Sequence, residues 1–113
     1  MADNCLFCRI VRGEIPAKLV AQTPECVAFS DVNPQAPLHV LVIPREHVAS
    51  LNDSRDPEQL GHLLTVAAEI ARREGFAERG YRTVINTGPD AGQTVFHVHL
   101  HLLAGRSLGW PPG

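Results

Sequence analysis

Ten residues near the C-terminal end, 94–103, place three histidines at alternate positions. Successive side chains of a β-strand point to opposite faces of a sheet, so His97, His99 and His101 are expected to share one face. The other face then carries only apolar side chains, those of Phe96, Val98, Leu100 and Leu102. The stretch therefore predicts a strand with an apolar back for a core and a row of imidazoles that faces a site.

Two other interpretations of the histidine row have to be weighed. A solvated hairpin face would also be polar, but threonine, lysine or glutamate suits it better than three histidines in register. A metal site would use two histidines at most, because His97 and His101 are about 13 Å apart along a strand. Near neutral pH an imidazole can donate a proton, accept one or attack as a nucleophile. The row therefore favours a catalytic site.

Length and composition indicate a single domain, 1–113, with a core at about 5–105 and a C-terminal tail at 106–113. The net charge of −2, with no basic cluster beyond Arg72-Arg73, argues against binding to extended nucleic acid. We see no signal peptide and no apolar run of membrane-spanning length, so no membrane association is expected. Three cysteines, an odd count, then predict a cytoplasmic protein with reduced thiols.

Cys5 and Cys8 form a CxxC motif in a segment that predicts one or two helical turns ending near Gly13. A lone CxxC has three interpretations: zinc ligands, a redox pair, or two buried thiols. A redox pair usually follows a strand of a βαβ unit, and no strand is expected before this one. Zinc needs two further ligands, for which His47 and His97 are available. On the residues alone, zinc and buried thiols stay open in equal measure.

Hydrophobic patterns predict three strands before a long helix, at 18–22, 26–31 and 38–43. The third is apolar on both faces and ends at Pro44, which places it at the centre of a sheet. His39 lies on this strand, and we expect it to belong to the site of the histidine row rather than to be a satisfied core histidine. Cys26 is expected to be an ordinary core thiol.

A long helix is predicted from the N-cap Asp56 to a stop near Gly75. Apolar residues recur in it at helical spacing, at Leu60, Leu63, Leu64, Ala67 and Ala71. His62 lies off this stripe and is expected to be solvated. A strand at 81–86 and a tight turn at 87–93, whose glycines can bring backbone N–H groups close to an anion, lead into the histidine strand. The order of elements predicts an α+β domain with a five-stranded antiparallel sheet.

The chemistry that such a row supports is attack on phosphorus. A middle histidine held in one tautomer by a neighbouring group can form a phosphoryl-imidazole, which water later clears. The glycine-containing turn would stabilise the phosphate charge. The sequence has no HExxH motif and no DxD pair. The row therefore favours nucleotidyl transfer without a catalytic metal over metal-assisted hydrolysis.

The run His97-Val98-His99-Leu100-His101-Leu102-Leu103 is similar to the His-x-His-x-His-x-x motif of the histidine triad (HIT) family. The resemblance spans about 5–113 and includes the segments 12–18, 31–39, 43–44, 92–96 and 109–113. It points to the nucleotide-binding branch, the purine nucleoside phosphoramidases. The resemblance implies a homodimer whose two sheets join. It also implies hydrolysis of purine nucleoside 5′-phosphoramidates, and of aminoacyl adenylates, through a covalent nucleotidyl-histidine.

The resemblance also assigns roles to residues. His99 would be the nucleophile, His101 would contact the phosphate, and His39 would join their hydrogen-bonded network. The purine base would lie between Phe7, Ile10, Phe29 and Val32. The ribose hydroxyls would bind Asp31. The phosphate and the leaving group would be held by Asn86, Gly92, Gln93 and Thr94. Trp110, in a tail that reaches the partner subunit, would shape the preference for the leaving group.

Some other HIT proteins hold zinc with two cysteines and two histidines, and Cys5, Cys8, His47 and His97 fit that pattern. The resemblance thus favours a structural zinc, with no cofactor in the chemical step. Two other functions remain as alternatives. One is a nucleotide- or protein-binding module with vestigial catalysis. The other is a metal-dependent hydrolase in which His97 and His99 are ligands.

Overall fold

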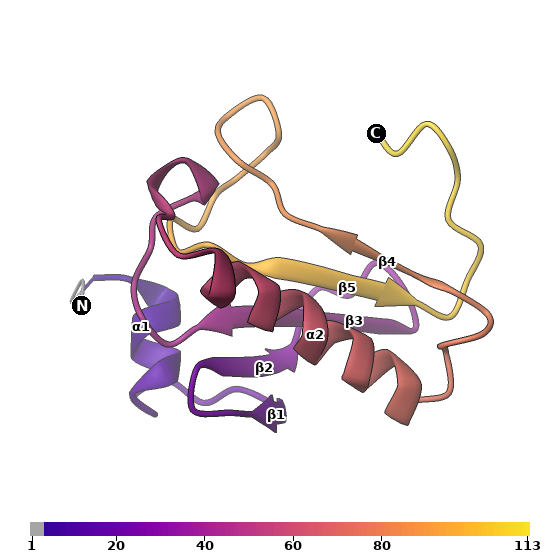
Figure 1. Cartoon of the computed structure of the whole chain (residues 1–113), viewed down its shortest axis with the longest axis horizontal. Helices are drawn as coiled ribbons and strands as arrows, with labels where there is room; N and C mark the ends of the chain where they lie inside the picture. Colours follow the sequence, from indigo (N-terminus) through magenta and orange to yellow (C-terminus); the bar gives the residue numbers. More distant parts are fainter. Residues whose placement is uncertain (1–3) are drawn as a thin grey trace.

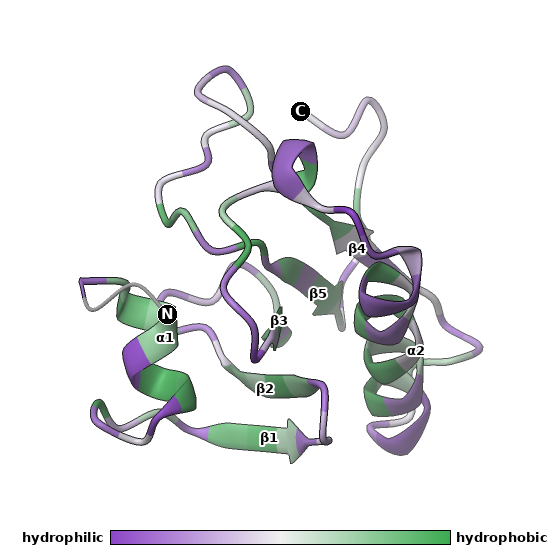
Figure 2. Ribbon diagram, turned by 60° about the vertical axis from the view of Figure 1, so that its left-hand side comes forward, coloured by the Kyte–Doolittle hydropathy of each residue, from purple (hydrophilic) through white to green (hydrophobic). Residues whose placement is uncertain are grey.

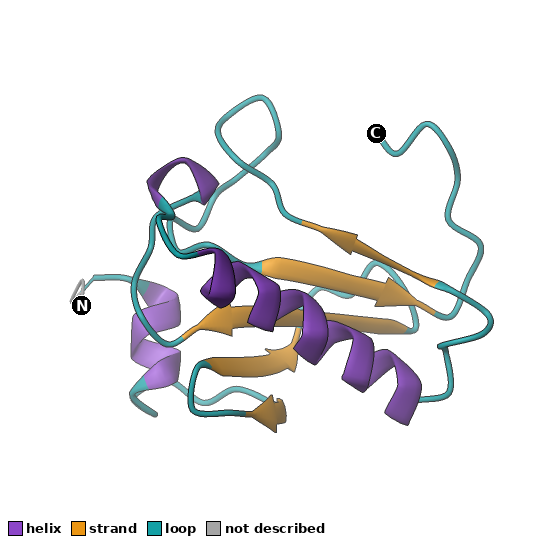
Figure 3. Cartoon of the chain, viewed as in Figure 1, coloured by secondary structure: helices purple, strands orange, loops and turns teal. Residues whose placement is uncertain are grey.

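The computed structural model describes residues 4–113, which form a five-stranded antiparallel sheet flanked by two helices (Figures 1 and 3). The strands are arranged in the order β1-β2-β3-β5-β4. They span Leu19–Gln22 (β1), Cys26–Ser30 (β2), Leu38–Pro44 (β3), Tyr81–Val84 (β4) and Leu100–Ala104 (β5). The helices span Leu6–Val11 (α1) and Pro57–Arg73 (α2), and a short 3-10 helix spans Leu51–Asp53 (η1). The predicted α+β class is confirmed.

Strand β3 lies at the centre of the sheet, as its sequence predicted, and pairs with β2 on one side and β5 on the other. Val40, Val42 and Ile43 have at most 1% of their surface exposed. A strand that is covered on both faces requires apolar residues at both odd and even positions, which is what the run at 38–43 supplies.

Helix α2 lies across one face of the sheet, with its apolar side toward the strands (Figures 1 and 2). The Asp56 carboxylate caps it by accepting bonds from the backbone N–H groups of Glu58 and Gln59. Its buried side chains join residues of β2, β3 and β5 in one core. That core contains Cys26, Ala28, Val40, Val42, Leu63, Val66, Ala67, Ile70, Ala71, Leu100 and Leu102.

One residue of the predicted helical stripe was assigned wrongly. Leu64 is 49% exposed, whereas Val66 and Ile70 are buried against the sheet. Successive helical residues turn by about 100°, so a face centred on Leu63 and Ala67 takes in positions 66 and 70 and leaves position 64 at its edge. Cys26 is buried in this core, as predicted.

Helix α1 lies on the opposite face of the sheet (Figure 2). Its buried side chains, Phe7 and Cys8, pack on strands β2 and β3 in a second cluster. The helix ends where predicted, since Arg12 is its C-cap and Gly13 has a φ of +76°, a region that favours glycine. The sheet thus has an α2 face, which is core, and an α1 face, where the site lies.

The predicted histidine strand is only half correct, because β5 begins at Leu100. Residues 95–97 form a bend, and the Val98 N–H donates to the carbonyl of Val48 at 2.6 Å rather than to a neighbouring strand. Phe96 is therefore 60% exposed, not part of the core. The bend turns the His97 ring toward the cysteines of α1, which regular strand alternation would not allow.

The segment before β5 also differs from the prediction of a tight hairpin. Strand β4 ends at Val84, and residues 85–99 form a long loop that contains the predicted turn, with Gly88 and Gly92 both at a φ of +82°. The Gln93 side chain, which is buried, stabilises this loop. It donates to the carbonyls of Ala49 and Val95 and accepts the N–H of Gly88.

The last residues leave β5 and run beside the outer edge of β4 (Figure 1). Arg82 of β4 donates to the backbone carbonyl of Gly109 at 2.9 Å and so attaches the tail to the strand. Within residues 4–113, no helix has the length and apolar character needed to cross a membrane.

Candidate active site

The pairing of β3 with β5 brings His39 and His101 together. His39 lies opposite Leu103, and His101 lies opposite Leu41, so the two histidines are diagonal neighbours on the α1 face. Their rings are joined by a hydrogen bond of 2.9 Å between His39 Nε2 and His101 Nδ1. The prediction that His39 belongs to the histidine site is consistent with this contact.

The surrounding groups fix which nitrogen of each ring carries the proton. The backbone N–H of Gln35 donates to His39 Nδ1 at 3.0 Å, so that nitrogen must present a lone pair. A neutral His39 then carries its proton on Nε2, and this proton is donated to His101 Nδ1. It follows that His101 carries its own proton on Nε2. The Asp31 carboxylate, 3.4 Å from His39 Nε2, favours the same arrangement.

The opposite tautomer is fixed in His99. Its Nδ1 lies 2.8 Å from the backbone carbonyl of His97, which can only accept, so Nδ1 carries the proton and donates it. Nε2 of His99 then carries a lone pair, to which no group of residues 4–113 donates. The ring of Phe7 packs edge-on against His99, with 5.1 Å between ring centroids. A buried imidazole with a fixed donor on one nitrogen and a lone pair on the other has the arrangement of an activated nucleophile.

Burial keeps the neighbouring histidines uncharged at neutral pH. Burial, together with the adjacent His99 and His39 imidazoles, lowers the pKa of His101 to about 4. Burial also lowers the pKa of His39 below its usual value, although the Asp31 carboxylate opposes this. Neutral His101 is therefore a hydrogen-bond donor without a charge at neutral pH.

A mostly apolar cavity of about 510 Å³ opens on this face, between α1 and the start of β1. Eight predicted site residues line it, namely Phe7, Ile10, Phe29, Asp31, Val32, Thr94, His99 and His101. Five do not line it: His39, Asn86, Gly92, Gln93 and Trp110. His39 reaches the cavity through His101, whereas the polar groups of Gln93 are bonded within the loop at 85–99. Trp110 lies in the tail and is 82% exposed.

Several residues that line the cavity were not predicted as site residues. Ile15, Pro16 and Ala17, in the segment that joins α1 to β1, form part of its wall, as do Leu41 and Val95. The signal available in the sequence was weak, since these are isolated apolar residues with no periodic pattern. Leu41 could have been assigned, because it shares a face of β3 with His39.

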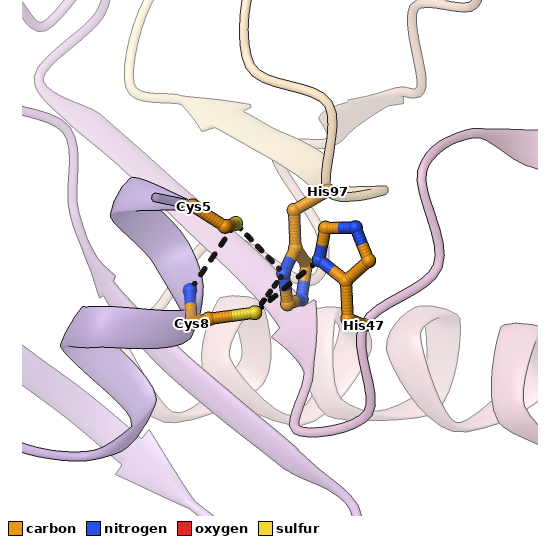
Figure 4. Close-up of side chains that lie close together, drawn as sticks. All are labelled: Cys5, Cys8, His47 and His97. Atoms are coloured by element: carbon orange, nitrogen blue, oxygen red, sulfur yellow. Dashed lines mark hydrogen bonds between the residues drawn. The ribbon is translucent and has the colours of Figure 1, made fainter. Parts of the chain in front are cut away.

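The four predicted metal ligands converge on one point (Figure 4). The ring of His97 lies in contact with both cysteines, with its Nδ1 3.5 Å from Cys5 Sγ and 3.5 Å from Cys8 Sγ. Nδ1 of His47 lies 3.2 Å from Cys8 Sγ. All four ligand atoms are within 4.8 Å of one another, so the cluster could hold a metal ion.

The His97 ring is oriented as a ligand would be. Its Nε2 lies 2.8 Å from the backbone carbonyl of Pro44, so this nitrogen carries the proton and Nδ1 presents its lone pair to the cysteines. Metal-binding histidines commonly donate their other N–H in this way. Burial lowers the pKa of His97, which keeps the ring neutral and the lone pair available.

A second group of potential ligands, Asp31, His39 and His101, also lies within 4.8 Å. Here the hydrogen bonds argue against a metal ion. Coordination by His39 Nε2 would force the proton of His39 onto Nδ1, where it would oppose the N–H of Gln35. This group is therefore better described as a hydrogen-bonded relay.

Residues 12–108 match the sequence model of the HIT domain. The chain belongs to the HIT family. It is 50% identical to the purine nucleoside phosphoramidase of Escherichia coli K12 over 96% of this chain and 93% of that protein. An uncharacterised HIT-like protein of Synechococcus elongatus is 55% identical over the full length of both chains.

Solved structures of HIT proteins agree with this fold. A HIT family hydrolase from Legionella pneumophila, 50% identical, superposes with a TM-score of 0.95 over 97% of this chain and all of that one. A histidine triad protein from Clostridium difficile, 42% identical, gives a TM-score of 0.92 over 96% of both chains. The chain is thus similar over nearly its whole length to HIT family hydrolases.

Within this HIT domain the three histidines do not form one row. His97 turns its ring toward the cysteines and offers only its carbonyl to His99. His99 and His101 face the cavity, with 5.1 Å between their ring centroids. The alternative of a metal-dependent hydrolase, with His97 and His99 as ligands of one metal, is disfavoured, because Nδ1 of His97 points to Cys5 and Cys8.

Proposed function

We propose that the protein is a nucleotide-binding hydrolase that cleaves the P–N bond of purine nucleoside 5′-phosphoramidates through a covalent nucleotidyl-His99. Aminoacyl adenylates are a second class of substrate. The observation that carries the proposal is the state of His99, whose Nδ1 donates to the His97 carbonyl while Nε2 keeps a lone pair at the cavity. The activity named for the E. coli relative supports the class of substrate.

The reaction has two displacements at phosphorus. The Nε2 lone pair of His99 attacks, the P–N bond breaks, and the amine leaves with the bonding pair and takes a proton from solvent. The ring is then a nucleotidyl-imidazolium whose Nδ1–H stays bonded to the His97 carbonyl. Water next attacks phosphorus and gives up a proton to solvent, the bond to Nε2 breaks with its electron pair returning to the ring, and the nucleoside monophosphate leaves. No step needs a metal ion.

The relay stabilises the transition states. His101 donates its Nε2–H to a non-bridging phosphate oxygen, on which negative charge increases as the nucleophile attacks. Its pKa of about 4 keeps it a neutral donor across the physiological range. Thr94, which lines the cavity, binds the phosphate and leaving-group side together with Asn86, Gly92 and Gln93 of the adjoining loop.

The nucleoside occupies the apolar part of the cavity. The aromatic rings of Phe7 and Phe29, 5.4 Å apart and nearly perpendicular, form a wall suited to a purine face, which Ile10 and Val32 complete. The Asp31 carboxylate accepts hydrogen bonds from the ribose hydroxyls. One of its oxygens already accepts the N–H of Asn33 at 2.8 Å, which holds the carboxylate in place.

The cluster of Cys5, Cys8, His47 and His97 holds a structural zinc ion in this proposal. A tetrahedral zinc with bonds of about 2.3 Å to sulfur and 2.0 Å to nitrogen separates its S and N ligands by about 3.5 Å. The observed S to N distances of 3.2–3.5 Å are close to this value. The ion would join α1 to the residues before β5 and stabilise the fold.

The active unit is a homodimer in the cytoplasm, in which the two sheets join. Strand β4 supports this, because it is an edge strand to which no other strand of residues 4–113 pairs on its outer side. Trp110, exposed in the tail beside β4, then extends from the domain toward the partner's site and contacts the leaving group.

Turnover tests the chemical proposal. Wild-type protein is expected to release AMP from adenosine 5′-phosphoramidate, and His99→Ala to be slower by at least about 10³-fold, since the covalent step is lost. The matched control is His62→Ala, which removes a half-buried histidine of α2 that does not line the cavity. This variant is expected to keep the wild-type rate. Brief chelation leaves the rate unchanged. Wild-type protein that binds AMP but releases none from the substrate would favour the binding module instead.

Metal content tests the zinc proposal separately. Wild-type protein is expected to retain one zinc per chain after dialysis, and Cys8→Ser to lose it. Cys26→Ala changes a buried thiol outside the cluster and keeps the metal. Equal zinc in Cys8→Ser and wild type would rule out this site.

A further inference from the structure

The hydrogen-bonded relay of the active site continues beyond His39 to the surface. Arg106, the second residue after β5, donates from Nε to the backbone carbonyl of Gln35 at 2.9 Å. The backbone N–H of Gln35 donates to His39 Nδ1, and His39 Nε2 is hydrogen-bonded to His101 Nδ1. A side chain outside the cavity is thus connected to the phosphate-facing imidazole through one backbone residue and one ring.

The loop at 33–37 is held against the end of β5. A Cβ atom placed on Gly105 would lie 2.8 Å from Pro37 Cβ, so the Gly105 backbone packs on the Pro37 ring more closely than a residue with a Cβ could without a shift of its neighbour. Gly105 also has a φ of +100°, which suits glycine. This close packing brings Arg106 over Gln35. The Gln35 side chain donates in turn to the carbonyl of Asn33 at 3.0 Å.

The position of the Gln35 N–H decides between two arrangements of protons. With its N–H on His39 Nδ1, His101 carries a proton on Nε2 and donates to the substrate. If that N–H moves away, His39 can take its proton on Nδ1 and accept from His101 Nδ1 instead. His101 Nε2 would then present a lone pair to an anionic phosphate, which is repulsive. A hydrogen bond between His39 Nε2 and His101 Nδ1 can form with either proton arrangement, so this bond alone does not select the tautomer.

We propose that Arg106 is a positioning residue for the reaction: by binding the Gln35 carbonyl it holds the Gln35 backbone, so that the Gln35 N–H keeps His39, and through it His101, in the tautomer that donates to the phosphate. The inference rests on the proposed function for its effect on rate, but the tautomer is observable without turnover. Asp31 supports the same tautomer from the other side of His39. Loss of Arg106 is therefore expected to increase the population of the other tautomer of His101 without making it the major one.

The test compares Arg106→Gln and Arg106→Lys with wild type and with Arg79→Gln, an exposed arginine at the same end of the sheet that lies over the Phe76 ring. In protein labelled with 15N-histidine, two-dimensional 1H–15N spectra report which nitrogen of His101 is protonated. Wild type is expected to show protonated Nε2. Arg106→Gln shows a mixture of tautomers, while Arg106→Lys and Arg79→Gln resemble wild type.

The kinetic expectation is a fall in kcat of about three- to tenfold for Arg106→Gln, the size of one hydrogen bond's net effect, with KM changed less than twofold. Gln35→Pro removes the N–H donor itself and produces the same tautomer mixture with a larger fall in kcat. Unchanged His101 tautomers in both Arg106→Gln and Gln35→Pro would overturn the inference. If the His101 tautomers shift in these variants but wild-type protein shows no turnover, the positioning role of Arg106 stands and only the proposed function is overturned.

Discussion

The low pKa of His101 predicts how stability depends on pH. In the unfolded chain a histidine titrates near 6.5, whereas in the fold His101 titrates at about 4. Between these values the unfolded state binds more protons than the folded state. The free energy of unfolding therefore falls as the pH decreases from about 6.5 to about 4, and this loss is complete below the lower value.

The size of the loss follows from the same pKa. A difference of about 2.5 pKa units corresponds to about 3.4 kcal/mol, at 1.36 kcal/mol for each unit. His101 is only partly buried, and solvent screening reduces this figure to about 1–2 kcal/mol. His39 and His97 also have lowered pKa values and contribute with the same sign, so His101 has to be isolated by a variant.

Urea unfolding of wild type and His101→Asn at pH 7.5, 6.0, 5.0 and 4.5 measures this contribution. Asparagine can still accept the proton of His39, but it does not titrate. Wild type is expected to lose about 1–2 kcal/mol more than the variant between pH 7.5 and 4.5. Equal losses in the two proteins, within about 0.3 kcal/mol, would refute the reasoning, since neither the pKa nor the burial of His101 would then affect folding.

Three further predictions concern the core, the helix cap and the loop before β5. Leu63→Ala removes a fully buried side chain and should cost about 2–5 kcal/mol in urea unfolding, while Leu64→Ala, on the exposed side of the same helix, should cost less than about 0.5. Asp56→Ala removes the cap of α2 and should cost about 1 kcal/mol, which Asp56→Asn largely avoids. Gln93→Ala breaks three hydrogen bonds of the loop at 85–99, so limited proteolysis should cut that loop faster than in wild type.

The sequence predicted the sheet well because its strands carry clear patterns. The run at 38–43 is apolar at odd and even positions, which only a central strand requires, and the cap Asp56 begins α2 where expected. Local patterns could not show the bend at 95–97. It depends on contacts of His97 with Cys5 and Cys8, about ninety positions away in the chain.

The site was predicted in its residue types rather than in its arrangement. Strand alternation predicted that His97, His99 and His101 share one face. In the structure only His99 and His101 face the cavity. The tautomers depend on backbone groups, namely the Gln35 N–H and the His97 carbonyl, which every residue has and no sequence pattern marks. The segment of the cavity wall at 15–17 has no signal of its own, because it acts through its position between α1 and β1.

The proposed mechanism depends most on His99 as the nucleophile, and detection of the covalent intermediate tests this role directly. Wild-type protein mixed with adenosine 5′-phosphoramidate, quenched within milliseconds and digested, is expected to give a peptide that contains His99 and is heavier by one adenylyl group. The same peptide from His99→Gly should be unmodified. An adenylyl group on another residue, or its absence at every time while AMP is still released at the wild-type rate, would contradict nucleophilic catalysis by His99.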